Sequence, residues 1–190
     1  MTPGTAAVTL VVGMLVSGHL LAGEGSGAAE PNDTVDDESS WTVEALPRSS
    51  SVRYTTNGHA VHGHQFGFLK QAGSCGADVV WLTWSSPHDG LIDYKGQTAE
   101  VRLTVADTTR LLRIPIVAVS SINKILHVAV MTNLAADHRL KLLLASSDEA
   151  SVTVVAPKEL VGHVDVSSER FDITGFATAH EQATEACQSL

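Results

Sequence analysis

Residues 101–105, VRLTV, place Val101, Leu103 and Val105 on one side of an extended chain and two polar residues on the other. This period of two is typical of a β-strand with one buried face. Upstream, residues 78–86 read DVVWLTWSS and carry apolar residues at both parities, which predicts a strand covered on both faces. These two stretches favour a mainly β fold.

Further strand candidates follow, separated by polar breaks at hairpin-like spacing. They are residues 110–120, 125–132, 139–145 and 151–155. Pro115 lies inside the first of them and indicates an edge or a β-bulge, because proline has no backbone N–H to donate to a neighbouring strand. No alternation of strands with helices is visible. The pattern therefore predicts an antiparallel sheet folded into a β-sandwich or an open barrel.

The C-terminus has a different period. Phe176, Ala179, Ala183 and Cys187 follow one another at steps of three and four, which predicts one C-terminal amphipathic helix. A threonine hydroxyl, from Thr174 or Thr178, is expected to cap its start.

The N-terminus begins with an apolar run, residues 6–22, followed by small residues that suit cleavage near residue 22 or 28. We interpret residues 1–23 as a secretory signal peptide, which would leave no stable membrane span after cleavage. An uncleaved anchor is the alternative, because no Lys or Arg precedes the run and His19 lies inside it.

Charge separates the next segment from the rest of the chain. Residues 24–40 contain six of the 21 acidic residues and none of the 12 basic ones, so we expect an acidic, disordered linker. Residues 41–190 keep 15 acidic and 12 basic residues, dispersed along the chain, which gives no nucleic-acid footprint. Their length is that of a single β-rich domain.

The chain has two cysteines, Cys75 and Cys187. After an export signal, two lone cysteines are expected to pair, and closing so long a loop would add roughly 4 kcal/mol. The disulfide would pin the C-terminal helix near the strand that begins at Asp78. A periplasmic or secreted location follows from this interpretation.

Three of the nine histidines fall within residues 59–64. On an extended chain His62 and His64 project from the same face, so both imidazoles could reach one metal ion, whereas His59 has the wrong parity. His88 or His163 could provide a further ligand. Imidazole ligands suit copper or zinc.

The run TNGHAVHGHQFG, residues 56–67, followed by Gly73-Ser74-Cys75, resembles the copper strand of copper-zinc superoxide dismutases. The resemblance implies a β-sandwich with His62 and His64 as copper ligands, His88 and His163 as the remaining candidates, and a disulfide to the C-terminus. The family's further zinc-binding histidines are absent, so the implied site holds copper alone.

A second resemblance covers residues 75–190. A cysteine that leads into a strand, then a meander, then FDITGF at 171–176 opening a helix that ends at Cys187 is similar to small exported bacterial envelope proteins. Type VI secretion-associated accessory proteins and invasion-associated periplasmic proteins are of this kind. The likeness implies a non-enzymatic envelope module.

No serine-nucleophile elbow and no phosphate-binding loop is present. Ser86, His88 and Asp89 are adjacent in sequence, which is no sign of a catalytic triad, because triads assemble from separate elements. We interpret them as loop residues, and the three tryptophans as core.

We therefore expect an exported, non-enzymatic protein of the cell envelope that binds another envelope protein or a small ligand. The alternative is a copper-binding, dismutase-like redox protein that uses His62, His64, His88 and His163.

Overall fold

The computed structural model describes residues 40–61, 63–147, 150–164 and 166–190. The strand that contains Val101 is β5 (Thr98–Val105), and it buries one face at alternate residues as expected. It pairs antiparallel with β6 (Thr108–Ile122) on one side and β8 (Ser151–Val155) on the other. The period-two prediction is confirmed here.

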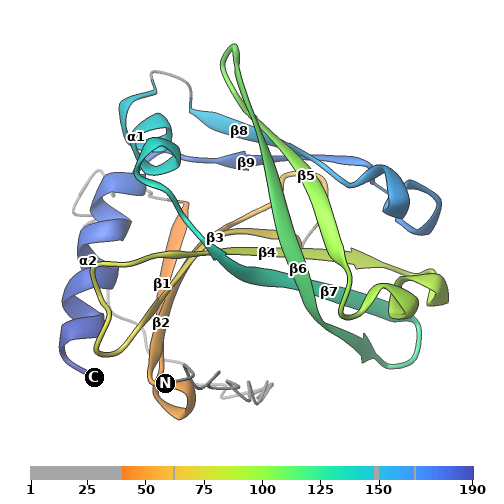
Figure 1. The fold of residues 1–190 in the computed structure, drawn as a ribbon, viewed down its shortest axis with the longest axis horizontal. Helices are drawn as coiled ribbons and strands as arrows, with labels where there is room; N and C mark the ends of the chain where they lie inside the picture. The colour runs from red at the N-terminus through yellow and green to blue at the C-terminus, as the bar shows by residue number, and fades with distance from the viewer. Residues whose placement is uncertain (1–39, 62, 148–149, 165) are drawn as a thin grey trace, which may run out of the picture. The chain divides into compact units, whose positions relative to one another are not determined.

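The described residues contain nine strands, which form one antiparallel sheet in the order β1-β2-β3-β4-β7-β6-β5-β8-β9. The remaining strands are β1 (Trp41–Leu46), β2 (Ser51–Asn57), β3 (Gln65–Gln71), β4 (Val79–Ser86), β7 (Leu126–Ala135) and β9 (Ser168–Asp172). The sheet curls without closing: in the described residues β9 meets the segment just after β2 through an isolated bridge between Gly58 and Phe171 and a hydrogen bond from the His59 N–H to the Arg170 carbonyl oxygen. The mainly β, antiparallel prediction is confirmed (Figure 1).

Pro115 lies where β6 changes partners. It is the last residue of β6 that pairs with β5, opposite Thr98, and pairing with β7 begins at Ile116. A register shift follows between Ile116 and Ala118. The predicted bulge is thus found next to the proline, where the strand bends from one partner to the other.

One predicted strand is wrong. Residues 139–145 belong to helix α1 (His138–Ser146). The Asp137 carboxylate caps this helix by accepting a hydrogen bond of 2.6 Å from the Leu140 backbone N–H. Leu140 and Leu144, four residues apart, are its buried residues, which is a helical and not an extended spacing.

The C-terminal helix is confirmed as α2 (Phe176–Gln188), with Phe176, Ala179, Ala183 and Cys187 buried. Its expected threonine cap is wrong. Gly175 occupies the N-cap position with a φ of 79°, and no side chain caps the helix. The left-handed turn at the entrance to the helix favours glycine over threonine.

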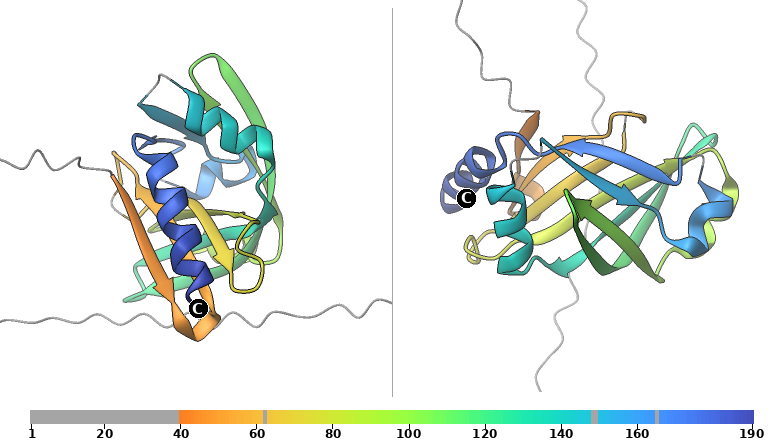
Figure 2. Two further views of the ribbon diagram at one scale, coloured as in Figure 1. Left: turned by 90° about the vertical axis from the view of Figure 1, so that its left-hand side faces the viewer. Right: turned by 90° about the horizontal axis from the view of Figure 1, so that it is seen from above.

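The two helices and two of the 3-10 turns lie at opposite ends of the sheet. Both views in Figure 2 place α1 and α2 together, and the right-hand view places η2 (Asp89–Tyr94) and η3 (Lys158–His163) at the far end. A third turn, η1 (Pro47–Ser49), joins β1 to β2. We call the end with α1 and α2 the helical end, and the end with η2 and η3 the 3-10 end.

Between the two ends lies an apolar core. The three tryptophans are buried, and Trp41 and Trp84 belong to this core as the sequence indicated, whereas Trp81 is buried outside it beneath the Arg53 guanidinium. Aromatic rings from three elements meet under α2, where Phe176 lies 5.4 Å from Trp41 and 5.6 Å from Phe68, measured between ring centroids.

Within the described residues, no helix is long and apolar enough to cross a membrane. The predicted signal peptide, residues 1–23, and the acidic linker, residues 24–40, fall outside the described residues except for Ser40.

Candidate functional site

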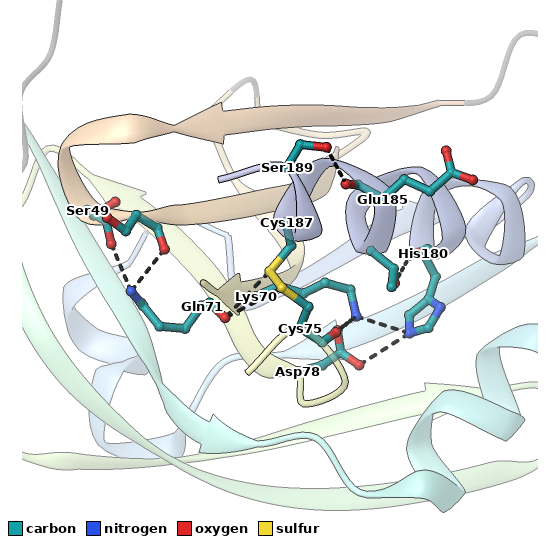
Figure 3. Close-up of a disulfide and its surroundings, with 11 residues drawn as sticks. Ser49, Lys70, Gln71, Cys75, Asp78, His180, Glu185, Cys187 and Ser189 are labelled. Carbon is teal, nitrogen blue, oxygen red and sulfur yellow. Dashed lines mark hydrogen bonds and ion pairs between the residues drawn. A yellow bond between two sulfur atoms is a disulfide. The ribbon is translucent and has the colours of Figure 1, made fainter. Parts of the chain in front are cut away.

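The helical end is held by the predicted disulfide. Cys75, in the turn between β3 and β4, is bonded to Cys187 near the end of α2, with the two Cα atoms 5.7 Å apart. The Cys187 side is buried and the Cys75 side is partly exposed. The bond therefore fixes α2 to the sheet beside the start of β4, as expected (Figure 3).

Beside the disulfide lies a buried ionic network centred on Asp78. Lys70, whose side chain is fully buried, places Nζ 2.7 Å from Asp78 Oδ1, and Lys141 places Nζ 2.7 Å from Oδ2. The Tyr54 hydroxyl donates to Oδ1 at 2.8 Å. His180 reaches from α2 to within 3.3 Å of Oδ2 (Figure 3). One carboxylate thus joins β2, β3, α1 and α2.

The network fixes the charge states of its members. Burial by itself would raise the pKa of Asp78, but hydrogen bonds from Lys141, Lys70 and Tyr54 and the charge of Lys70 outweigh it and lower that pKa. Burial, with the neighbouring carboxylate charge, raises the pKa of the Tyr54 hydroxyl far above its ordinary value. Asp78 is therefore ionised and Tyr54 neutral, as an ion-pair network that stabilises the fold requires.

A second buried carboxylate, Glu169, lies on β9. It accepts hydrogen bonds from the backbone N–H groups of Ala60 and Val61 at 2.9 and 3.0 Å, and so holds the loop between β2 and β3 against the sheet. Gly58 makes this close approach feasible, because a Cβ there would lie 2.6 Å from the Glu169 Cδ. The loop that carries the histidine cluster is thereby anchored.

His64 contacts Glu169 as well, and its side chain is fully buried. Its Nδ1 lies 3.2 Å from Glu169 Oε2, and its Nε2 lies 3.3 Å from the Ser85 carbonyl oxygen. The ring stacks on Trp84 with centroids 4.5 Å apart. Both nitrogens face acceptors, so a metal ion could bind His64 only after one of these contacts is broken.

Two other predicted ligands, His88 and His163, lie at the 3-10 end of the sheet. His88 precedes η2, and its backbone N–H donates to the Ser86 hydroxyl. His163, at the end of η3, packs its ring against Gly90 and lies 5.4 Å from the Tyr94 ring. His62 lies outside the described residues.

In the part of the chain that the structure describes, no group of three or more histidine, cysteine or acidic residues is placed to hold a metal ion. The four-histidine copper site, with His62 among its members, stays a prediction.

The 3-10 end also exposes apolar side chains from three segments. Ile92 in η2 is 45% exposed, Val161 in η3 is 50% exposed, and Ile125 in the turn between β6 and β7 is 71% exposed. η2 contacts η3 and also β6 and β7, the strands that the turn at Ile125 joins, so it is near both other segments. We call residues 92, 125 and 161 the apolar rim.

Sequence reasoning missed both buried networks and the rim. Asp78 was visible only as a residue that precedes a strand, and Lys70 only as one charge among dispersed ones. A lysine within the apolar strand QFGFLKQ, followed eight residues later by an aspartate, is the signal that could have indicated a buried ion pair across the β3–β4 turn.

Comparison with known proteins found no match. No protein-family model matches the chain, no curated protein matches it, and no solved structure matches it.

Proposed function

We propose that this chain is an exported protein of the bacterial cell envelope that acts by binding another envelope protein through its 3-10 end. The observation that carries the proposal is the disulfide between Cys75 and Cys187, which fixes α2 over the buried Asp78 network. Disulfides of this structural kind form in oxidising compartments such as the periplasm.

The contacts at the helical end stabilise the fold. Its charged groups pair with one another under α2, and the disulfide closes over them. An end arranged in this way offers a rigid support for the rest of the sheet, and a partner is better placed at the opposite end.

The 3-10 end has the features of a binding surface. The apolar rim exposes three aliphatic side chains from three segments, and such clusters mark interaction sites more often than isolated exposed residues do. Asp93, Lys95 and Lys124 are exposed in or beside the same segments, which gives the rim polar neighbours of both signs.

The test is photo-crosslinking in cells that export the chain. A photoreactive amino acid is introduced at position 92, 125 or 161, and for comparison at Leu111 or Leu142, which are exposed to a similar degree on β6 and α1. We expect a discrete adduct with one envelope protein from the rim positions alone. Equal adducts from rim and control positions, or none from the rim, would contradict the proposal.

A further inference from the structure

At the 3-10 end, three side chains from separate segments form a hydrogen-bonded chain. Ser121 near the end of β6 places Oγ 2.8 Å from His127 Nδ1. The other ring nitrogen, Nε2, lies 2.7 Å from Asp89 Oδ1 at the start of η2. Ser121 and His127 are direct partners in the register of β6 and β7. The Asp78 and Glu169 networks include none of the three.

The order of these groups fixes the direction of the hydrogen bonds. An ionised carboxylate only accepts, so the proton of a neutral imidazole must sit on Nε2, facing Asp89. Nδ1 then has a free lone pair and accepts the Ser121 O–H. A hydroxyl that donates to an imidazole whose second nitrogen is held by a carboxylate is the arrangement of an activated nucleophile.

The three hydrogen-bonded side chains differ in burial, and the differences suit a nucleophile, its base and a positioning carboxylate. The His127 side chain is only 3% exposed, so the base is held by packing. Ser121 is exposed as a residue, which suits a nucleophile that a substrate must reach from solvent. The Asp89 side chain is 89% exposed, and we assign it a positioning role with a modest effect, since solvent screens its charge.

We propose that Ser121 is a base-activated nucleophile that takes an acyl group from carboxylic esters. In the first step Ser121 Oγ bonds to the ester carbonyl carbon while its proton moves to His127 Nδ1. The C–O bond to the alcohol then breaks, and the imidazolium returns the proton to the departing alcohol. A water molecule, deprotonated by the same nitrogen, hydrolyses the Ser121 ester, releases the acid and restores the hydroxyl.

The surroundings of Ser121 indicate the class of ester. Ile125, four residues on in the same hairpin, is the most exposed of the large apolar side chains in the described residues. Because Ile125 lies in the turn of the hairpin that carries Ser121, an ester with an apolar acyl chain is the class that we assign to this site. The imidazole is turned over relative to serine proteases, in which Nε2 faces the serine, but proton transfer needs only one accepting and one held nitrogen.

The experiment uses the purified, oxidised full chain, a fluorophosphonate probe and p-nitrophenyl butyrate. Like an ester, the probe is attacked by Ser121 Oγ, which bonds to phosphorus as fluoride leaves. We expect one label per chain, located on Ser121 by peptide mass spectrometry and lost in Ser121→Ala. Ser120→Ala, which changes the neighbouring residue on the opposite face of β6, should label like the unaltered chain. His127→Gln should slow labelling and ester hydrolysis by at least about a hundredfold.

Asp89→Asn is the second variant, because an exposed side chain can be changed even if His127→Gln does not fold. It should slow labelling by roughly tenfold, less than the loss of the base itself. An unlabelled chain, a label elsewhere than Ser121, or labelling that neither His127→Gln nor Asp89→Asn slows would overturn the proposal. Since the probe acts on the purified chain without a partner, failure here leaves the crosslinking result independent.

Discussion

Replacing Asp78 by alanine should destabilise the fold more than any single change at an exposed charge. The substitution leaves the Lys70 ammonium fully buried without its carboxylate, and it removes the acceptor of the Tyr54 hydroxyl. The Cys75 carbonyl oxygen, 3.0 Å from Lys70 Nζ, remains but carries no charge. Breaking a buried ion pair on one side typically costs about 3–5 kcal/mol.

Urea unfolding, followed by tryptophan fluorescence with the disulfide intact, measures this loss. With a slope of about 2 kcal/mol per molar urea, which is ordinary for a domain of this size, the midpoint should fall by roughly 1.5–2.5 M. Asp93→Ala is the matched control, because Asp93 is exposed on η2, and its effect should stay within about 0.5 kcal/mol.

The double variant Lys70→Met, Asp78→Leu removes both charges but fills the space with apolar side chains, so it distinguishes the effect of charge from the effect of packing. Because the fully buried Lys70 ammonium is removed together with the carboxylate, and Lys141 is 22% exposed and can turn to solvent, part of the lost stability should return. A loss below about 1 kcal/mol in Asp78→Ala, or a double variant as unstable as the single one, would refute the role assigned to the network.

Three further predictions concern the sheet and the 3-10 end. Burial by itself would raise the pKa of Glu169. Hydrogen bonds from three backbone N–H groups and the nearby charge of His64 outweigh burial, so the net effect is a pKa below the unfolded value of 4.5. The ionised Glu169 carboxylate therefore contributes its full stability above pH 4.5, and this contribution is lost as the pH falls further. Glu169→Gln should flatten the acid side of a plot of urea midpoint against pH. An unchanged slope would contradict this. Gly67→Ala should cost about 1–3 kcal/mol in the same urea assay, because its Cβ would overlap the Tyr54 carbonyl oxygen across the β2–β3 pair, whereas Gly76→Ala meets open space and should be neutral. Protein isolated from the periplasm should hold less than one copper per chain by metal analysis, because both His64 nitrogens face acceptors. One copper per chain that His64→Ala abolishes would favour the dismutase-like alternative instead.

The sequence predicts strands well where one face is buried and the other is solvated. Val152 and Val154 alternate with less buried neighbours, and their strand is found where the pattern placed it. The segment RLKLLLA misled because Leu140, Leu142 and Leu144 also alternate, although Leu142 is 50% exposed. The Asp137 cap resolves this ambiguity, since it is a helix-start signal directly before the segment.

The polar networks could not be predicted, because each joins residues whose pairing depends on the folded register. Glu169 follows His64 by 105 residues, and Ser121 contacts His127 only because the hairpin places them opposite each other. A periodic pattern reports which face of a strand is buried. It carries no information about which buried polar groups meet there.

The most direct measurement is the intact mass of the chain recovered from the envelope fraction of a bacterium that expresses residues 1–190. We expect a species cleaved near residue 22 or 28 and lighter by two hydrogen atoms than its reduced form, with Cys75 and Cys187 in one disulfide-linked peptide pair. An uncleaved chain in the cytoplasmic fraction with two free thiols would contradict the proposed export and, with it, the proposed envelope function.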